Sequence, residues 1–222
     1  MARLARYVLP GIPHHVTQRG NGRQQTFFGD ADYRAYRDLL AVHCAAHGVA
    51  VWSWVLMPNH VHLIVVPEHI DALRGALSKV HRAYAGRIHA REQRTGHFWQ
   101  GRFGCAAMDE AHLLAALRYV ALNPVRARLA TRAQDWRWSS VQALLDPQTG
   151  DGLTETGPVL SRVPDFAELL RSGEEHEALT MALRRSESTG RPLGDSAFLE
   201  CIEAVLGRNP RPAKRGPKAR VV

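Results

Sequence analysis

The sequence lacks the features that mark several large protein classes. Its three cysteines, Cys44, Cys105 and Cys201, are isolated and form no CxxC pair, which argues against a disulfide framework and a thiolate zinc site. No apolar run approaches the roughly 20 residues of a membrane span. Met1–Pro10 has neither a long apolar segment nor a small-residue cleavage site. These absences predict a protein of a reducing bacterial cytoplasm, with no membrane partner.

Acidic residues are scarce in two segments of the chain. Residues 72–108 hold seven basic side chains against one acid, and residues 208–222 hold six against none. Residues 109–207 instead hold fifteen acidic and ten basic side chains, so the net charge of +8 is concentrated in two places. Lys and Arg contacts to phosphate supply most of the non-specific affinity for nucleic acid. The tail therefore predicts a polyanionic partner, whereas the middle segment is equally compatible with a basic face that only aids solubility.

Hydrophobic residues make up 45% of the chain, enough for a substantial core. Periodicity and turn residues predict, in order, strand Ile12–Arg19, helix Asp30 to about His47, strand Val49–Met57, strand His60–Val66, a helix from Asp71, a strand within Phe98–Met108 and a helix from Asp109. Asp30, Asp71 and Asp109 are suited to begin their helices as caps, Gly48 to stop the first helix, and Pro58-Asn59 to form the turn between the second and third strands. We expect Val49–Met57 to be a central strand because it is apolar on both faces. The order predicts an α+β fold, a ferredoxin-like split βαβ antiparallel sheet with one added helix.

The composition changes after the predicted sheet domain. Residues 146–165 are rich in Gly, Pro and Thr, as is typical of a linker or long loop. Two helices are predicted beyond it, one from Phe166 toward Ser186 and one over Ser196–Leu206. We therefore predict three regions: the sheet domain over 1–145, a linker and small helical extension over 146–207, and a basic tail, disordered without a partner, over 208–222.

Two histidines in a predicted strand are the strongest local signal. His60 and His62 are separated by one residue, so their side chains lie on the same face of the strand. Two imidazoles placed in this way can hold one metal ion. An HxH pair alone is more often a pair of hydrogen-bonded histidines on a half-exposed sheet. Here it interrupts a central, apolar strand, where two polar rings need partners.

Tyr119 and Asn123 form a second pair, four residues apart. On a helix this spacing places both side chains on one face. A phenol is a nucleophile suited to phosphate, and an amide oxygen is a hard ligand suited to a hard cation. Two other interpretations stay open at this point. Tyr119 is also typical of a core aromatic, and Asn123 is also suited to cap a following helix that begins at Pro124.

Together these residues resemble the REP-associated tyrosine transposases, which belong with the single-tyrosine insertion-sequence transposases of the HUH nuclease superfamily. The resemblance covers roughly residues 5–145, and its motifs occur in the order that the family has. It is carried by five stretches, namely His14–Gly20, Met57–Leu63, Phe98–Phe103, Tyr119–Val125 and Trp136–Ser140.

The resemblance implies a metal-dependent enzyme that nicks and rejoins single-stranded DNA beside hairpins of repetitive extragenic palindromes, at the nucleoid. It implies His60, His62 and Asn123 as ligands of Mg²⁺ or Mn²⁺ and Tyr119 as the nucleophile. The product would be a 5′-phosphotyrosine that keeps its bond energy for rejoining, which accords with the absence of a GxxxxGK[ST] loop. The target sequence, the general base, action of Tyr119 in cis or in trans, and the choice between monomer and homodimer stay open.

Residues for DNA contact are predicted from charge and aromaticity, because bases stack on aromatic rings while Arg and Lys follow the backbone. The predicted residues are Arg74, Lys79, Arg82 and Arg87 in the second helix, Trp99 and Arg102 before the fourth strand, and Arg211, Lys214, Arg215 and Lys218 in the tail. For Trp99 the alternative is core packing, which is common for aromatic residues that precede a strand.

Three other functions are compatible with parts of the sequence. The main alternative is a domesticated, non-catalytic hairpin-binding protein, although such a protein need not keep His60, His62, Tyr119 and Asn123 together. An RNA-binding ferredoxin-like module would display aromatic residues, rather than two histidines, on its sheet. A hydrolytic zinc enzyme would commonly use a third nitrogen or carboxylate ligand, and the sequence has no HExxH.

Overall fold

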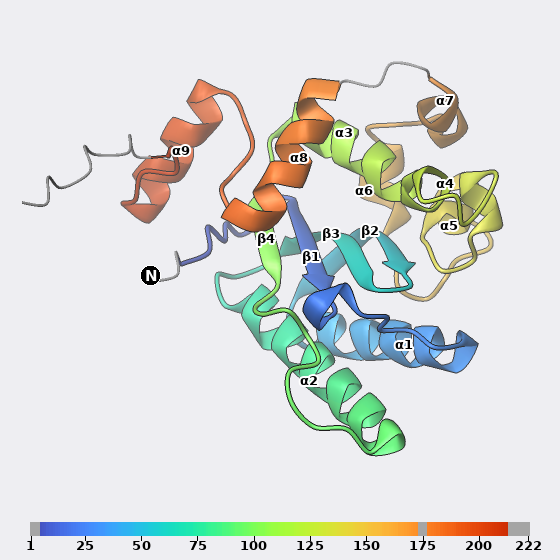
Figure 1. The fold of residues 1–222 in the computed structure, drawn as a ribbon. Coiled ribbons are helices and arrows are strands. Elements are labelled where there is room, and N and C mark those ends of the chain that lie inside the picture. Colours follow the sequence, from blue (N-terminus) through green and yellow to red (C-terminus); the bar gives the residue numbers. More distant parts are fainter. Residues whose placement is uncertain (1–4, 173–176, 213–222) are drawn as a thin grey trace, which may run out of the picture.

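The computed structural model describes residues 5–172 and 177–212. In these residues a four-stranded sheet lies between two layers of helices (Figure 1). The strands are β1 His14–Arg19, β2 Val49–Met57, β3 His60–Pro67 and β4 Gly104–Ala107. The helices are α1 Asp30–Ala46, α2 Ala72–Glu92, α3 Glu110–Ala121, α4 Asn123–Arg126, α5 Val141–Leu145, α6 Thr156–Leu160, α7 Phe166–Arg171, α8 Glu177–Thr189 and α9 Ser196–Leu206, with 3-10 turns at Asn21–Arg23 and Ala133–Asp135.

The strand order confirms the ferredoxin-like prediction. The sheet runs β2-β3-β1-β4, and each neighbouring pair is antiparallel. Helix α1 connects β1 to β2, and α2 connects β3 to β4, so each connection skips one strand of the sheet. This is the split βαβ arrangement, and α3 is the added helix.

The prediction that Val49–Met57 is central is wrong, because β2 lies at the edge of the sheet. Its outer edge is covered by a later part of the chain. The amide of Leu56 donates to the carbonyl of Trp138 at 2.9 Å, and the amide of Glu155 donates to the carbonyl of Val51 at 2.8 Å. An edge strand covered in this way is as buried as a central one. The apolar pattern therefore reported burial, not position in the sheet.

The alternation of side chains gives the sheet two different faces. One face packs under α1 and α2 in a core cluster that includes Leu63 and Tyr36. The other packs under α3 and α8 in a cluster that includes Ile64, Leu117 and Leu183. Figure 1 shows α1 and α2 below the sheet and α3 and α8 above it. We call these the α1/α2 face and the α3/α8 face.

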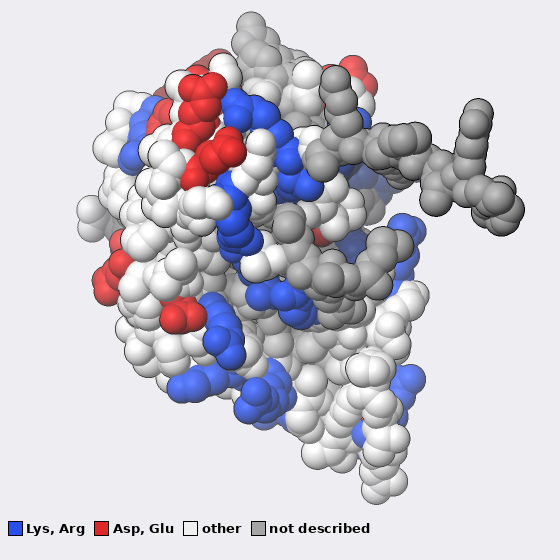
Figure 2. All heavy atoms as spheres, turned by 90° about the vertical axis from the view of Figure 1, so that its left-hand side faces the viewer, with Lys and Arg blue, Asp and Glu red and all other residues white. Residues whose placement is uncertain are grey.

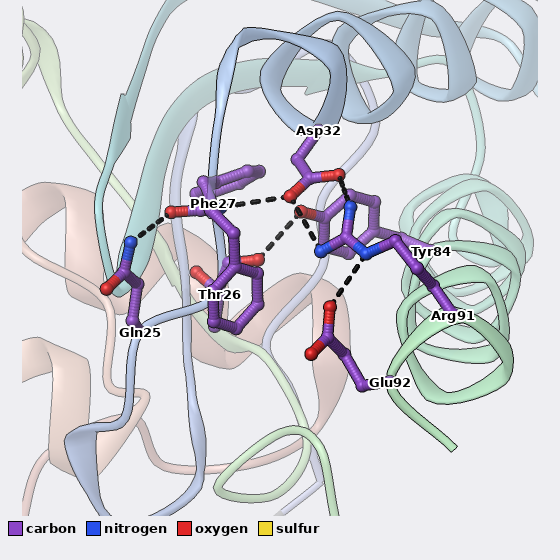
Figure 3. Close-up of polar contacts among 8 residues, drawn as sticks. Gln25, Thr26, Phe27, Asp32, Tyr84, Arg91 and Glu92 are labelled. Atoms are coloured by element: carbon purple, nitrogen blue, oxygen red, sulfur yellow. Dashed lines mark hydrogen bonds and ion pairs between the residues drawn. The ribbon is translucent and has the colours of Figure 1, made fainter. Parts of the chain in front are cut away.

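A buried carboxylate fixes the loop between β1 and α1 (Figure 3). Asp32, whose side chain is 1% exposed, accepts the amide of Phe28 at 2.9 Å and pairs with Arg91 of α2 at 2.6 Å. The hydroxyl of Tyr84 donates to the carbonyl of Thr26 at 2.7 Å. A carboxylate removed from water requires partners of this kind. The same loop hydrogen-bonds the turn between β2 and β3, so its position bears on the residues that follow that turn.

Helix ends follow the predicted residues in part. Asp109 accepts the amide of His112 at 2.9 Å and caps α3 as predicted. Gly48, predicted to stop α1, has a φ of 62°, a conformation that favours glycine. The predicted caps at Asp30 and Asp71 make no capping hydrogen bond. Asp30 is already the first residue of α1, with Gly29 in the cap position, and Asp71 is in the cap position of α2 but its side chain accepts no amide there.

The region after the sheet domain differs from the prediction. The helix predicted from Phe166 toward Ser186 is two helices, α7, which ends at Arg171, and the separate α8. The segment predicted as a linker contains α6 and packs on β2, where the indole nitrogen of Trp54 donates to Asp151 at 2.9 Å. This segment is therefore part of the packed structure.

The last described residues return to the N-terminal segment. The guanidinium of Arg208 donates to the carbonyl of Arg6 at 2.9 Å, and α9 packs its Ile202 against Tyr7 and Leu9. The rest of the predicted tail, residues 213–222, lies outside the described residues. In the described part of the chain, no helix is both long and apolar enough to cross a membrane.

Candidate active site

Strand β3 presents two histidines to the α3/α8 face. His60 and His62 lie on the side of β3 that also carries Ile64, as the alternation of a strand requires. Their ring centroids are 4.9 Å apart. The ring of His62 is buried, whereas His60 is partly exposed. The predicted shared face is confirmed, and β3 is an inner strand as expected.

Helix α3 brings Tyr119 to the same place. Its apolar positions Leu113, Leu117 and Val120 are fully buried against the sheet, which sets the rotation of the helix. The Tyr119 ring then lies edge-on to His62, with 5.5 Å between ring centroids. Residues 57 positions apart in the sequence are thus neighbours, and they belong to one chain.

Each histidine of β3 is held by a neighbour. Nδ1 of His60 lies 2.6 Å from Oδ1 of Asn59, so this nitrogen carries the proton and Nε2 keeps its lone pair. Nδ1 of His62 lies 3.0 Å from Nε2 of His15 on the adjacent strand β1. The bond to Asn59 orients His60 and fixes its tautomer, whereas the bond between the two imidazoles orients His62 and allows either ring to donate.

The environment keeps these rings neutral. Burial, together with the charge of Arg19, lowers the pKa of His60 to about 3. Burial, together with the other histidines and Arg19, lowers the pKa of His62 well below its ordinary value. Burial alone lowers the pKa of His15 to about 4. Neutral imidazole is the form that binds a metal ion.

The Tyr119 hydroxyl lies beside a carboxylate of α8. It donates to Oε1 of Glu187 at 3.4 Å. The guanidinium of Arg126 lies over the Tyr119 ring, 4.4 Å from its centroid, and donates to the Tyr119 carbonyl. Burial raises the pKa of Tyr119, the charge of Glu187 adds to that, and Arg184 and Arg126 act in the opposite direction. The phenol is therefore protonated at neutral pH and must lose its proton before or during any attack.

Asn123 is the first residue of α4, one turn after Tyr119. The cap position of α4 is occupied by Leu122, and no side chain makes a capping hydrogen bond at this helix start. Asn123 therefore does not cap the helix. The side chain is 9% exposed, and its amide nitrogen is buried with no hydrogen-bond partner in the described part of the chain. Amide oxygen and nitrogen are assigned from their partners, so this unsatisfied amide is equally able to present oxygen.

The residues present fit a hard divalent cation with an amide as third ligand. In residues 5–172 and 177–212, no three His, Cys, Asp or Glu side chains converge as a metal site. Two neutral imidazoles and one amide oxygen are nevertheless an acceptable partial ligand set, since such ions keep several waters. The unpartnered atom of Asn123 is its amide nitrogen, so the side chain would act as a third ligand with its amide turned to present oxygen.

A cleft of about 630 Å³ opens beside these residues. Its walls come from β1, the start of β4, the residues between α2 and β4, and the end of α8. His60 lines it, and four arginines line it as well, namely Arg6, Arg19, Arg102 and Arg184. Glu187 is the one acid among the described lining residues. A wall of guanidinium groups suits phosphate, which arginine binds in a bidentate manner.

Comparison with known proteins decides the family. A model of IS200-like transposases matches residues 10–123, slightly more than half of the chain. The chain belongs to the IS200-like transposase family. Among solved structures it is similar to a REP-associated tyrosine transposase bound to a REP hairpin, with 20% identity, a TM-score of 0.57, and coverage of 70% of this chain and 90% of that one.

A second solved structure is less similar. A candidate transposase from Deinococcus radiodurans R1 aligns with 20% identity and a TM-score of 0.35 over 58% of this chain and 92% of that one. Curated proteins include no match to the sequence. The fold of an IS200-like transposase is thus established by the family model and by the first of these structures.

In this IS200-like chain, the residues predicted to contact DNA do not gather in one place. Arg74, Lys79, Arg82 and Arg87 are exposed on α2, in the layer opposite Tyr119. Trp99 packs among core aromatics, and its indole nitrogen donates to the carbonyl of His81 at 2.9 Å. The structure thus gives Trp99 the core-packing role that we set out as its alternative.

The remaining predicted contacts lie nearer the cleft or beyond the described residues. Arg102 lines the cleft. Arg211 pairs with Glu200 and Glu203 of α9, at 3.4 and 3.6 Å. Lys214, Arg215 and Lys218 lie outside the described residues. Figure 2 shows basic side chains in a band across the side of the transposase that carries the N-terminus and α9, while acidic ones gather mainly in one part of it.

Sequence reasoning missed several residues of the site. His15 and Arg19 lie in the stretch that resembles the family's first strand, but their roles depend on the register of β1 against β3. Asn59 directly precedes His60 in the sequence, so its role as a hydrogen-bond partner of that ring could have been predicted from this adjacency. Glu187 and Arg184 come from α8, more than sixty residues after Tyr119, and no local pattern singles them out.

Proposed function

We propose that this transposase nicks and rejoins single-stranded DNA next to a hairpin, through a covalent bond between Tyr119 and a 5′-phosphate. One observation supports this most directly. The hydroxyl of a tyrosine on α3 lies beside a cleft with four arginines and next to two neutral histidines. A protonated phenol, a phosphate-binding wall and candidate metal ligands in one place are the components that such a transesterification requires.

His60, His62 and Asn123 would hold Mg²⁺ or Mn²⁺ in this proposal. When bound, the ion would neutralise charge that gathers on the phosphate during attack. The support is the fixed tautomer of His60, the neutral state of both rings, and the unpartnered amide of Asn123. Asn59 and His15 would orient the two rings, a role that neighbours of metal ligands commonly have.

The protein residues define the remaining steps. Arginines of the cleft would bind the DNA backbone and place a phosphate in line with the Tyr119 oxygen. Attack would join that oxygen to phosphorus and release a free 3′-hydroxyl. A second 3′-hydroxyl would later reverse the step and restore a DNA strand. Because Tyr119 and His62 are neighbours within one chain, we infer action of Tyr119 in cis.

The hairpin part of the proposal rests on a relative. The similar solved structure is a REP-associated tyrosine transposase bound to a REP hairpin. The two chains share a fold, and this chain has exposed cations on α2 and in the cleft. Hairpin DNA is therefore the substrate with which to test the chain.

A covalent adduct tests the proposal. We expect wild-type protein, incubated with Mn²⁺ and single-stranded DNA that carries a hairpin, to form an adduct that survives denaturing electrophoresis. Tyr119→Phe, which removes only the nucleophilic oxygen, should form none. An adduct of unchanged yield in Tyr119→Phe would show that another residue is the nucleophile. Binding of the hairpin without any adduct in wild type would instead favour the non-catalytic hairpin-binding protein.

A further inference from the structure

A carboxylate outside the proposed metal ligands contacts the nucleophile. Oε1 of Glu187 accepts the hydroxyl of Tyr119 at 3.4 Å, and Oε2 lies 3.9 Å from a guanidinium nitrogen of Arg19. Among the described residues of the cleft wall, Glu187 is the one acid and contacts the phenol directly. The family model ends at residue 123 and so does not include it.

The position of Glu187 is set by firm packing of α8. Leu183 and Ser186 of this helix are buried, and the helix lies over β4 and beside α3 (Figure 1). Gly104 of β4 permits this close approach, because a Cβ at 104 would come within 2.6 Å of the Thr17 hydroxyl and 3.1 Å of the Glu187 carbonyl. The helix presents Glu187 to Tyr119 from a fixed distance.

The chain that follows α8 also fixes its end. Gly190, with a φ of 62°, donates its amide to the carbonyl of Ser186 at 2.8 Å and turns the chain back toward the sheet. The amide of Leu193 then donates to the carbonyl of Ala107 in β4 at 2.8 Å. Glu187 therefore sits between two anchors, the packed helix before it and this strand contact after it.

The charges around Glu187 suit a group that accepts a proton. It faces Tyr119 from α3, Arg19 from β1, and Arg184 from its own helix. Burial raises the pKa of Glu187, while Arg19, the Tyr119 hydrogen bond and Arg184 lower it, so the carboxylate is somewhat more basic than an ordinary glutamate. A base whose pKa moves toward neutral pH is a better proton acceptor in catalysis.

We propose that Glu187 is the general base of the reaction, the group that takes the proton of Tyr119 as its oxygen attacks the DNA phosphate. This inference rests on the proposed function and supplies the one role that the sequence left unassigned. The geometry that carries it is direct contact with the reacting oxygen at the edge of the phosphate-binding cleft.

The proton and electron pairs balance in a single displacement. The Oη–H electrons of Tyr119 remain on oxygen and form the bond to phosphorus, and the proton passes to the Glu187 carboxylate. The bond between phosphorus and the 3′-oxygen breaks, its electron pair stays on that oxygen, and the oxygen takes a proton from water. In the joining step, the attacking 3′-hydroxyl gives its proton to water as its oxygen bonds to phosphorus. Protonated Glu187 returns its proton to the Tyr119 oxygen as the phosphotyrosine bond breaks.

Glu187→Gln separates this role from a structural one. Glutamine has the same shape and keeps an oxygen that accepts the Tyr119 hydroxyl, but it is not a base. We expect the rate of adduct formation to fall by a factor of about 10² to 10⁴, with hairpin binding and thermal stability retained. Glu187→Asp, which restores a carboxylate one methylene farther away, should recover part of the rate. Glu177→Gln, the same change at an exposed position of α8, is the matched control and should leave the rate unchanged.

The outcomes distinguish this inference from the function on which it rests. Wild-type adduct formation with an unchanged rate in Glu187→Gln would overturn the inference alone. A rate that rises in Glu187→Gln would also overturn it, because the carboxylate would then be an obstacle that occupies the place of the phosphate. No adduct with wild type, under conditions in which the hairpin binds, would overturn both the inference and the proposed function.

Discussion

The two faces of the sheet use the same residue types for different purposes. On the α1/α2 face, the hydroxyl of Tyr36 lies 2.9 Å from Nε2 of His81, and that of Tyr84 donates to a carbonyl at 2.7 Å. On the α3/α8 face, the hydroxyl of Tyr119 donates to Glu187 over a longer distance, 3.4 Å, and the buried amide nitrogen of Asn123 has no partner in the described residues.

The difference lies in how completely the polar groups are satisfied. Tyr36 and Tyr84 are fully buried with short hydrogen bonds, as polar groups in a core must be. On the α3/α8 face the two histidines have short hydrogen bonds, but the Tyr119 hydroxyl has a long one and the buried amide nitrogen of Asn123 has none in the described residues. His60 and Glu187 of this group line a cleft. A buried polar cluster with unused hydrogen-bonding capacity beside a cavity indicates a place for a ligand, whereas a complete cluster indicates structure.

Replacing one histidine on each face by alanine should give the largest contrast. His60 is partly exposed at the cleft, so His60→Ala should lower the rate of adduct formation by on the order of 100-fold or more, because several kcal/mol of charge stabilisation is lost. Its free energy of unfolding should change little. His81→Ala leaves a cavity under α2 and should lower the free energy of unfolding by about 2–4 kcal/mol. Adduct assays and urea denaturation measure the two effects.

The control for this contrast is the activity of each variant per folded molecule. His81→Ala should keep the wild-type rate once unfolded protein is discounted. If His60→Ala instead unfolds as readily as His81→Ala, both histidines support the fold and the distinction between the faces fails.

Two arginines provide a second, smaller contrast. Arg91 pairs with the buried carboxylate of Asp32, and its removal should lower the free energy of unfolding by about 2 kcal/mol, a value discounted because Arg91 itself is partly exposed. Arg102 lines the cleft, and Arg102→Ala should weaken hairpin binding and reduce the slope of log affinity against log salt by about 0.7–0.9. Salt titrations of hairpin binding, with Arg91→Ala as the matched control, measure this. An unchanged slope in Arg102→Ala would show that the cleft is not part of the DNA-binding surface.

Just below pH 6.5, the pH dependence of stability is the smallest expected effect. Burial, and then the charge of Arg6, lowers the pKa of His81 from 6.5 to about 3. Between these values the unfolded chain holds a proton that the folded chain does not. Stability is therefore fully present above pH 6.5 and is lost as the pH falls toward 3, by about 1.4 kcal/mol per pH unit for this one group.

His81→Gln removes this titration while it keeps a polar side chain. Urea denaturation at several pH values below 6.5 should show a shallower loss of stability in His81→Gln than in wild type. Equal slopes would mean that His81 is already protonated in the folded protein.

Much of the fold was predictable because its signals are local. The turn at Pro58-Asn59, the alternation in β3 and the cap of α3 by Asp109 each depend on a few neighbouring residues. The position of β2 was not predictable, because burial on both faces has the same pattern at the centre of a sheet and at an edge that another segment covers. The break between α7 and α8 was also missed, since the periodicity of the two helices reads as one.

The features of the candidate site also fall into those that local sequence predicts and those that only the folded structure shows. The sequence by itself determined that His60 and His62 share a face of β3 and that Tyr119 lies on a helix one turn before Asn123, because those relations follow from the 2.0 and 3.6 periodicities of strand and helix. Only the tertiary structure decided that Tyr119 lies beside His62, that His15 and Asn59 hold the two imidazoles, and that Glu187 of α8 contacts the Tyr119 hydroxyl. The physical reason is that such contacts depend on strand register and helix packing, which are set by the whole core and leave no mark on the residues nearby in sequence.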